Sequence, residues 1–169
     1  MDTDTVAQEE SGSGIAGVIA RPILLFPAAL LLGFALDHVM RVPFPISRIG
    51  TAHWISAIAA GCLIFIGVAV FRAGVRSFSR AETPLPTNQP VRVLVTAGIY
   101  SWTRNPIYLA FFLVYGGLGI LVRSPSILIL ALPLAITIRY GVVAREEAYL
   151  EQRFGDTYRE YKAHVRRWL

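Results

Sequence analysis

The chain has 169 residues, of which 54% are hydrophobic and only 16% are charged. Soluble domains carry about a quarter charged residues, so this composition excludes an ordinary soluble domain, and it equally excludes a disordered chain. The formal charge of +5 comes from basic residues that lie between apolar runs, where they indicate membrane orientation rather than nucleic-acid binding.

The apolar residues are grouped into runs of membrane-spanning size. The first 14 residues are acidic, small and polar, which predicts a disordered tail rather than a basic secretory leader. We expect residues 15–169 to form a single membrane domain. Its predicted spans lie at about residues 15–36, 51–71, 105–122 and 126–144.

Two further segments complete this predicted domain. A polar loop is expected over residues 72–104, and an amphipathic pattern predicts a surface helix over residues 145–167. The predicted fold is therefore all-α, a multi-span integral membrane protein with about four transmembrane helices and a C-terminal amphipathic helix. Whether the last two apolar runs are full crossings or a tilted, partly buried hairpin is left open by the sequence.

The basic residues predict how the chain is oriented. Four spans place the N-terminus, the 72–104 loop and the C-terminal segment on one side, which holds thirteen of the sixteen Lys and Arg residues. The positive-inside rule makes that side cytoplasmic. We therefore expect both termini and the active site on the cytoplasmic face of the plasma (inner) membrane.

Several kinds of site are excluded by what the sequence lacks. The three histidines have no metal-ligand spacing, and the single cysteine, Cys62, lies inside an apolar run, so we expect no metal site and no disulfide. No predicted span carries an acidic residue at its centre, as an ion-coupled transporter would need. P-loop and dinucleotide-binding motifs are also absent from the sequence.

The first stretch that could carry chemistry covers residues 94–108, L-V-T-A-G-I-Y-S-W-T-R-N-P-I-Y. It places Tyr100, Trp102, Arg104 and Tyr108 at a predicted helix start. Backbone amides there could hold a carboxylate, and the rings could stack on a purine or face a cation. The alternative is an interfacial aromatic belt with an ordinary helix cap.

The second stretch covers residues 145–150, R-E-E-A-Y-L. Glu146 and Glu147 have no basic residue three or four positions away with which to pair on a helix. Because adjacent helical residues point in different directions, we expect at most one of them to enter a given pocket. The alternative is that both begin a solvated helix face.

These two stretches follow one another in a specific order: L-V-T-x-G-x-Y, R-[H/N]-P-x-Y, an apolar hairpin, and E-E-x-x-L-x-x-x-F-G-x-x-Y-x-x-Y-x-x-x-V-x-R. Over about residues 83–167 this order resembles the isoprenylcysteine carboxyl methyltransferase family and its phospholipid N-methyltransferase relatives. The resemblance implies an integral membrane methyltransferase that uses S-adenosylmethionine and takes a lipophilic or lipidated substrate from the bilayer. The cofactor-binding residues that it implies are Arg92, Val93, Leu94, Val95, Tyr100, Asn105, Pro106, Ile107, Tyr108 and Glu146.

The sequence departs from the family pattern at two positions. Asn105 replaces a histidine, which removes a titratable group and argues against proton transfer there. Val142 stands where carboxyl-methylating members carry an arginine for the substrate carboxylate. Arg139, seven residues before Glu146 and so on nearly the same helix face, is the predicted substitute. Arg139 and Glu146 are accordingly the predicted catalytic residues.

The predicted function is S-adenosylmethionine-dependent methyl transfer to a lipophilic substrate, with the carboxylate of an isoprenylcysteine-like molecule as the first candidate. A phospholipid or small-molecule N- or S-methyltransferase of the same family is the main alternative. A small four-helix transporter, a reductase of similar membrane architecture and a non-catalytic scaffold are further alternatives. The methyl acceptor and the oligomeric state are left open.

Overall fold

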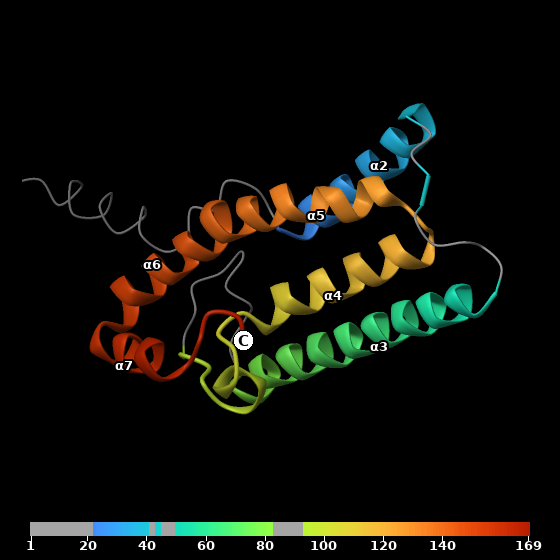
Figure 1. Ribbon diagram of the computed structural model, residues 1–169. Coiled ribbons are helices and arrows are strands. Elements are labelled where there is room, and N and C mark those ends of the chain that lie inside the picture. Colours follow the sequence, from blue (N-terminus) through green and yellow to red (C-terminus); the bar gives the residue numbers. More distant parts are fainter. Residues whose placement is uncertain (1–21, 41–42, 45–49, 83–92) are drawn as a thin grey trace, which may run out of the picture.

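The computed structural model describes residues 22–40, 43–44, 50–82 and 93–169 (Figure 1). The predicted N-terminal tail, the beginning of the predicted first span and Arg92 lie outside the described residues. The described chain is helical throughout its regular elements. These are α2 (Pro22–Met40), α3 (Thr51–Arg80), the short 3-10 helix η1 (Gly98–Ser101), α4 (Pro106–Leu121), α5 (Pro125–Thr137), the π-helical segment η2 (Ile138–Val143), α6 (Ala144–Phe154) and α7 (Asp156–His164).

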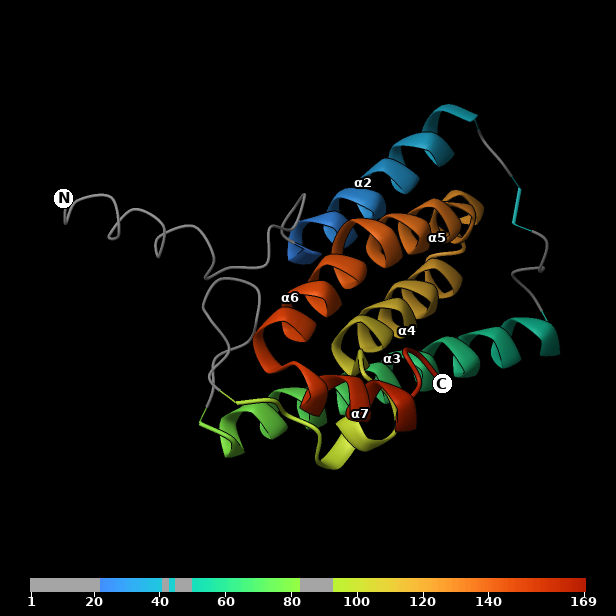
Figure 2. The same cartoon turned by 90° about the vertical axis from the view of Figure 1, so that its left-hand side faces the viewer.

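The helices have the lengths and composition of a multi-span membrane protein. α2, α3 and the continuous helix from Pro125 to Phe154 are each long and apolar enough to cross a bilayer, and α4 is a shorter apolar helix. α3 packs along α4, and α2 packs along α5. Both views place α4 between α3 and α5 (Figures 1 and 2). The prediction of an all-α, multi-span integral membrane protein is confirmed.

α3 is longer than the sequence predicted. The expected span ended at residue 71 and a loop was expected from residue 72, but the helix continues to Arg80. Arg72, Arg76 and Arg80 recur every four residues and so share one helix face, while Phe78 on another face is buried. The arginines therefore mark a change from an apolar helix to an amphipathic one, not its end.

The predicted helix over residues 145–167 is two helices. α6 ends at Phe154 and α7 begins at Asp156, with Gly155 between them at φ +54°. This φ lies in the left-handed region that glycine adopts without steric cost. The break lets α7 fold across the end of the bundle where α3 ends and α4 begins (Figure 2).

Candidate active site

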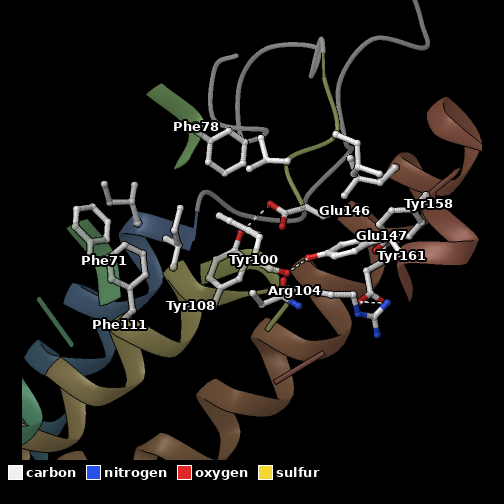
Figure 3. A pocket seen from close by; sticks show the side chains of 16 residues that line it. Phe71, Phe78, Tyr100, Arg104, Tyr108, Phe111, Glu146, Glu147, Tyr158 and Tyr161 are labelled. Carbon is white, nitrogen blue, oxygen red and sulfur yellow. Dashed lines mark hydrogen bonds and ion pairs between the residues drawn. The ribbon is translucent and has the colours of Figure 1, made fainter. Parts of the chain in front are cut away.

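A cavity of about 190 Å³ lies at the end of the bundle that is covered by α6 and α7 (Figure 3). α2, α3, α4, α6 and α7 contribute to its lining, together with η1 and the segment before it. Its lining residues are Ile23, Phe71, Phe78, Leu94, Val95, Tyr100, Arg104, Asn105, Ile107, Tyr108, Phe111, Glu146, Glu147, Leu150, Tyr158 and Tyr161. The cavity thus joins the two stretches, residues 94–108 and 145–150, whose composition suggested chemistry.

Tyr108 and Glu146 form a buried pair in the wall of this cavity. The Tyr108 hydroxyl donates a hydrogen bond of 2.7 Å to Oε1 of Glu146, and the two residues are each 7% exposed. Tyr108 lies in the first turn of α4, which begins at Pro106, and Glu146 lies in the first turn of α6. The starts of two helices are therefore tied together at the cavity.

Glu147 lines the same cavity and is held by two arginines. Arg104 Nη1 lies 3.3 Å from its Oε1, and Arg167 Nε donates a 3.1 Å hydrogen bond to that same oxygen. The expectation that at most one of the adjacent glutamates enters a given pocket is wrong, because the cavity extends around the beginning of α6 and reaches both side chains. The basic partner residues come from distant parts of the chain, which helical spacing does not reveal.

The segment after α7 holds the segment before α4 in place. The Arg167 carbonyl accepts hydrogen bonds from Thr103 Oγ1 at 3.2 Å and from Asn105 Nδ2 at 3.0 Å. The Arg104 amide donates to the carbonyl of Arg166 at 3.0 Å. Asn105 thus uses its amide group as a structural donor, a role that needs no titratable side chain.

Three tyrosines from η1 and α7 close the cavity. Tyr161 donates a 2.7 Å hydrogen bond to the carbonyl of Tyr100, and Tyr158 is only 1% exposed. Burial raises the pKa of Tyr158 to about 12, although the Arg104 guanidinium offsets part of that rise. Burial also raises the pKa values of Tyr100 and Tyr161 above the ordinary value for tyrosine. All three phenols are therefore neutral at physiological pH.

The structure brings most of the predicted site residues together. Those that line the cavity are Leu94, Val95, Tyr100, Asn105, Ile107, Tyr108 and Glu146. Pro106 is buried at the start of α4 without lining the cavity, and Val93 is 51% exposed outside it. Arg92 lies outside the described residues.

Arg139 is not brought to the cavity. Its side chain is exposed, and its guanidinium carbon lies 5.4 Å from the ring centroid of the neighbouring Tyr140. The reason is the π-helical segment Ile138–Val143, whose wider turn accommodates one extra residue and rotates the next part of the helix by roughly 100°. Arg139 and Glu146 therefore do not share a face, although a regular α-helix would have placed them on one. Val142, at the position of the family arginine, is 1% exposed in the apolar core.

Several residues that line the cavity have no site role in the sequence-based prediction. The polar ones are Arg104, Glu147, Tyr158 and Tyr161, and the apolar ones include Phe71 and Phe78. The amphipathic pattern predicts Tyr158 and Tyr161 only as part of a surface helix. Their three-residue spacing does place them on one face of α7, but only the tertiary fold shows that this face covers the cavity.

Comparison with known proteins agrees with the position of these motifs. The phospholipid methyltransferase family matches residues 55–157, which is more than half of the chain. The protein-S-isoprenylcysteine O-methyltransferase of Saccharomyces cerevisiae is 33% identical over 111 residues, covering 62% of this chain and 45% of the yeast protein. An uncharacterized protein of Haemophilus influenzae is 70% identical over 27 residues, covering 16% of this chain and 43% of that protein.

The matched region of the chain spans less than half the length of each of these relatives. The family match covers most of α3, all of α4 and α5, and the residues of α6 that line the cavity. On the extent of this match, the chain belongs to the phospholipid methyltransferase family.

Proposed function

We propose that this protein transfers a methyl group from S-adenosylmethionine to a lipophilic acceptor at the cytoplasmic face of the plasma (inner) membrane. The observation that carries the proposal is the cavity itself, because its wall is built from both family motifs and closed by the Tyr108–Glu146 hydrogen bond. The excess of basic residues on the side of this cavity supports the orientation.

The chemistry of the lining residues fits S-adenosylmethionine. Tyr100 and Tyr108 offer aromatic faces to a sulfonium or an adenine, and Glu146 can accept hydrogen bonds from ribose hydroxyls or an ammonium group. Arg104 Nε is buried with no hydrogen-bond acceptor among the described residues, so the cavity retains an unused donor. An orphaned buried donor is costly unless a ligand completes it.

Bound S-adenosylmethionine would supply an electrophilic methyl group. The role of the protein's own residues would then be to align the donor with the acceptor and to exclude water. Tyr158 and Tyr161 cover the cavity from α7, while Tyr108 fixes the carboxylate of Glu146. If the acceptor must lose a proton, Glu146 can accept it, because Glu147 is paired with two arginines. A thiolate or carboxylate acceptor needs no base.

A second cavity supports a lipophilic acceptor. It has a volume of about 300 Å³, is lined almost entirely by apolar groups of α2, α3 and α4, and shares Ile23, Phe71 and Phe111 with the first cavity. An apolar chain lying there would place its polar end toward Glu146. This arrangement suits an acceptor that enters from the bilayer.

Two classes of methyl acceptor are candidates. An isoprenylcysteine-like carboxylate is supported by the similarity to the yeast protein, which bears that name. A phospholipid or small-molecule amine or thiol is the alternative, favoured by the burial of Val142 in the core where a carboxylate-binding arginine would be needed. Supplying isotopically labelled methyl donor to membranes with and without the protein, and then analysing the lipids, separates these candidates.

The first test is binding of S-adenosylmethionine to the purified protein in detergent or nanodiscs. We expect saturable binding by calorimetry and, at one hundred times Kd, a stabilisation of about 2.7 kcal/mol. Glu146→Gln should weaken the binding. A folded wild-type protein that binds no S-adenosylmethionine would rule out the proposal, and substrate uptake into proteoliposomes would then favour the transporter alternative.

A further inference from the structure

The position of Arg104 is unusual for a cationic side chain. It is nine-tenths buried, it lines the cavity, and its Nε atom has no hydrogen-bond acceptor among the described residues. Its side-chain contacts are an ion pair with Glu147 at 3.3 Å through Nη1 and a hydrogen bond with the Tyr158 side chain. A buried guanidinium normally uses its fixed fork of N–H groups on a carboxylate or phosphate, so an acceptor is missing on the Nε side.

The charges on the wall of the cavity are separated into a positive and a negative region. Glu147 is shared by Arg104 and Arg167, so the three side chains together carry one positive charge in excess. The other carboxylate of the cavity, Glu146, is bonded to the neutral Tyr108 phenol and carries the compensating negative charge at a separate place. Arg104 also lies two residues before α4, and the positive end of that helix dipole favours an anion near the same place.

From this geometry we infer that Arg104 binds a carboxylate group of a ligand in the cavity. The inference rests on the proposed function and assigns to Arg104 the carboxylate recognition that sequence spacing gave to Arg139. Two carboxylates could fill the position: that of the amino-acid end of the methyl donor, or that of an acceptor. In the first case Glu146 and Arg104 together match an ammonium and a carboxylate of one zwitterion.

Hydrogen bonds of the backbone and of the neighbouring side chains keep Arg104 in place. Its backbone amide is bonded to Arg166, and Thr103 and Asn105 on either side are bonded to Arg167. The backbone that carries Arg104 is therefore fixed, and the ion pair with Glu147 orients its guanidinium, before a ligand arrives, which lowers the entropic cost of binding.

The donor arm of the test compares S-adenosylhomocysteine with its decarboxylated counterpart by calorimetry. Wild-type protein should bind the carboxylated ligand about 10- to 100-fold more tightly, the range expected for hydrogen bonds to a charged group. Arg104→Gln should reduce this ratio to near one, and Arg104→Lys should keep part of it. Arg166→Gln, the same charge change on an exposed side chain, is the matched control and should keep the full ratio.

The acceptor arm compares N-acetyl-S-farnesylcysteine with its carboxamide in the same way. If Arg104 serves the acceptor, the ratio of affinities in this arm falls in Arg104→Gln while the donor ratio stays unchanged. Melting temperatures show whether each variant is folded. If Arg104→Gln does not fold, the affinity ratios of the wild type and of Arg104→Lys still test the inference.

The inference is overturned if wild-type protein distinguishes neither pair of ligands by the carboxylate, or if Arg104→Gln keeps the discrimination. Binding of S-adenosylhomocysteine without discrimination removes only the role of Arg104. No binding of either adenosyl ligand by folded wild-type protein removes the proposed function itself.

Discussion

Tyr108 and Glu146 stand 38 positions apart in the sequence, yet the hydroxyl of one lies 2.7 Å from the carboxylate of the other. Their bond joins α4 to α6 at the wall of the cavity, and both side chains are buried. A buried carboxylate depends on such a donor because it has no water to replace it.

Tyr108→Phe should therefore weaken binding of the methyl donor and destabilise the fold. Removing one partner of a buried hydrogen bond costs about 1–3 kcal/mol, which corresponds to a loss of roughly 5- to 150-fold where the carboxylate contacts the donor. Calorimetry with S-adenosylmethionine and denaturant unfolding in detergent measure the two effects.

Tyr115→Phe is the matched control on the same helix. The Tyr115 side chain is 2% exposed, and its hydroxyl has no hydrogen-bond partner among the described residues. Its removal should leave donor affinity unchanged and stability equal or slightly higher, because an unpaired buried hydroxyl is unfavourable. Equal losses in both variants would contradict the role given to the Tyr108 hydroxyl.

Arg139→Gln tests the alternative that sequence spacing suggested. Because Arg139 is exposed and does not line the cavity, we expect donor affinity and methyl-transfer rate within about twofold of the wild type, as for other surface substitutions. A loss of tenfold or more in either quantity would show that the side chain reaches the reaction by a movement from its present position.

Apolar runs predict the helical membrane fold, which depends on local composition and spacing, and the family resemblance implies seven of the sixteen residues that line the cavity. Arg139 lies away from the cavity because of one π-helical turn, which changes the face of every later residue without changing the sequence distance. The sequence does not predict the ion pairs of Glu147 with Arg104 and Arg167, because these contacts depend on how α6, α7 and the C-terminal segment fold back.

Asp37→Ala should lower stability without changing donor affinity. Asp37 accepts hydrogen bonds from the Ser124 hydroxyl and, at 3.2 Å, from the Ser126 amide, and so caps α5 from the end of α2. Loss of a cap costs about 0.5–2 kcal/mol. Asp37 stands fourteen residues along α2 from Ile23, which lines the cavity, a distance of about 21 Å. Unfolding curves measure the loss of stability, and calorimetry measures the affinity for the methyl donor. A changed Kd for the methyl donor would contradict the expectation that Asp37 acts on stability alone.

Gly117→Ala should disturb the packing of α4 on α3. A Cβ at Gly117 would lie 2.9 Å from the Ala60 carbonyl oxygen and 2.7 Å from Ile64 Cγ1, so the helices would have to separate. We expect a loss of about 1–3 kcal/mol, the usual cost of overpacking.

The adjacent Gly116 supplies the control for this change. Beyond its chain neighbours and the backbone of its own helix, no atom of the described residues comes within 4 Å of the position that its Cβ would occupy. Gly116→Ala should be neutral or stabilising by up to about 1 kcal/mol, because alanine favours the helix more than glycine does. Thermal unfolding of the two variants side by side distinguishes a steric effect at Gly117 from a general intolerance of α4 to substitution.

Alkaline pH should destabilise the protein through its buried phenols. The pKa of Tyr158 is about 12 in the folded protein and about 10 in an unfolded chain, so between these values the unfolded state loses the proton first. The free energy of unfolding should therefore fall as the pH rises from about 10 to 12, and Tyr158→Phe should reduce that fall. Chemical denaturation at several pH values measures the slope, and phenolate absorbance of the folded protein reports whether ionisation is delayed.

The hydrogen bonds to the Arg167 carbonyl also bear on when the cavity can form during synthesis. The partner of Thr103 and Asn105 lies more than sixty residues downstream of them, and the Arg167 guanidinium lies twenty residues downstream of Glu147. α2 to α5 can enter the membrane while the ribosome is still translating, but a nascent chain that has not yet reached Arg167 lacks the groups that hold Arg104 and the beginning of α4. The wall of the cavity is therefore completed only once Arg167 has been synthesised, when α2 to α5 are already available for membrane insertion.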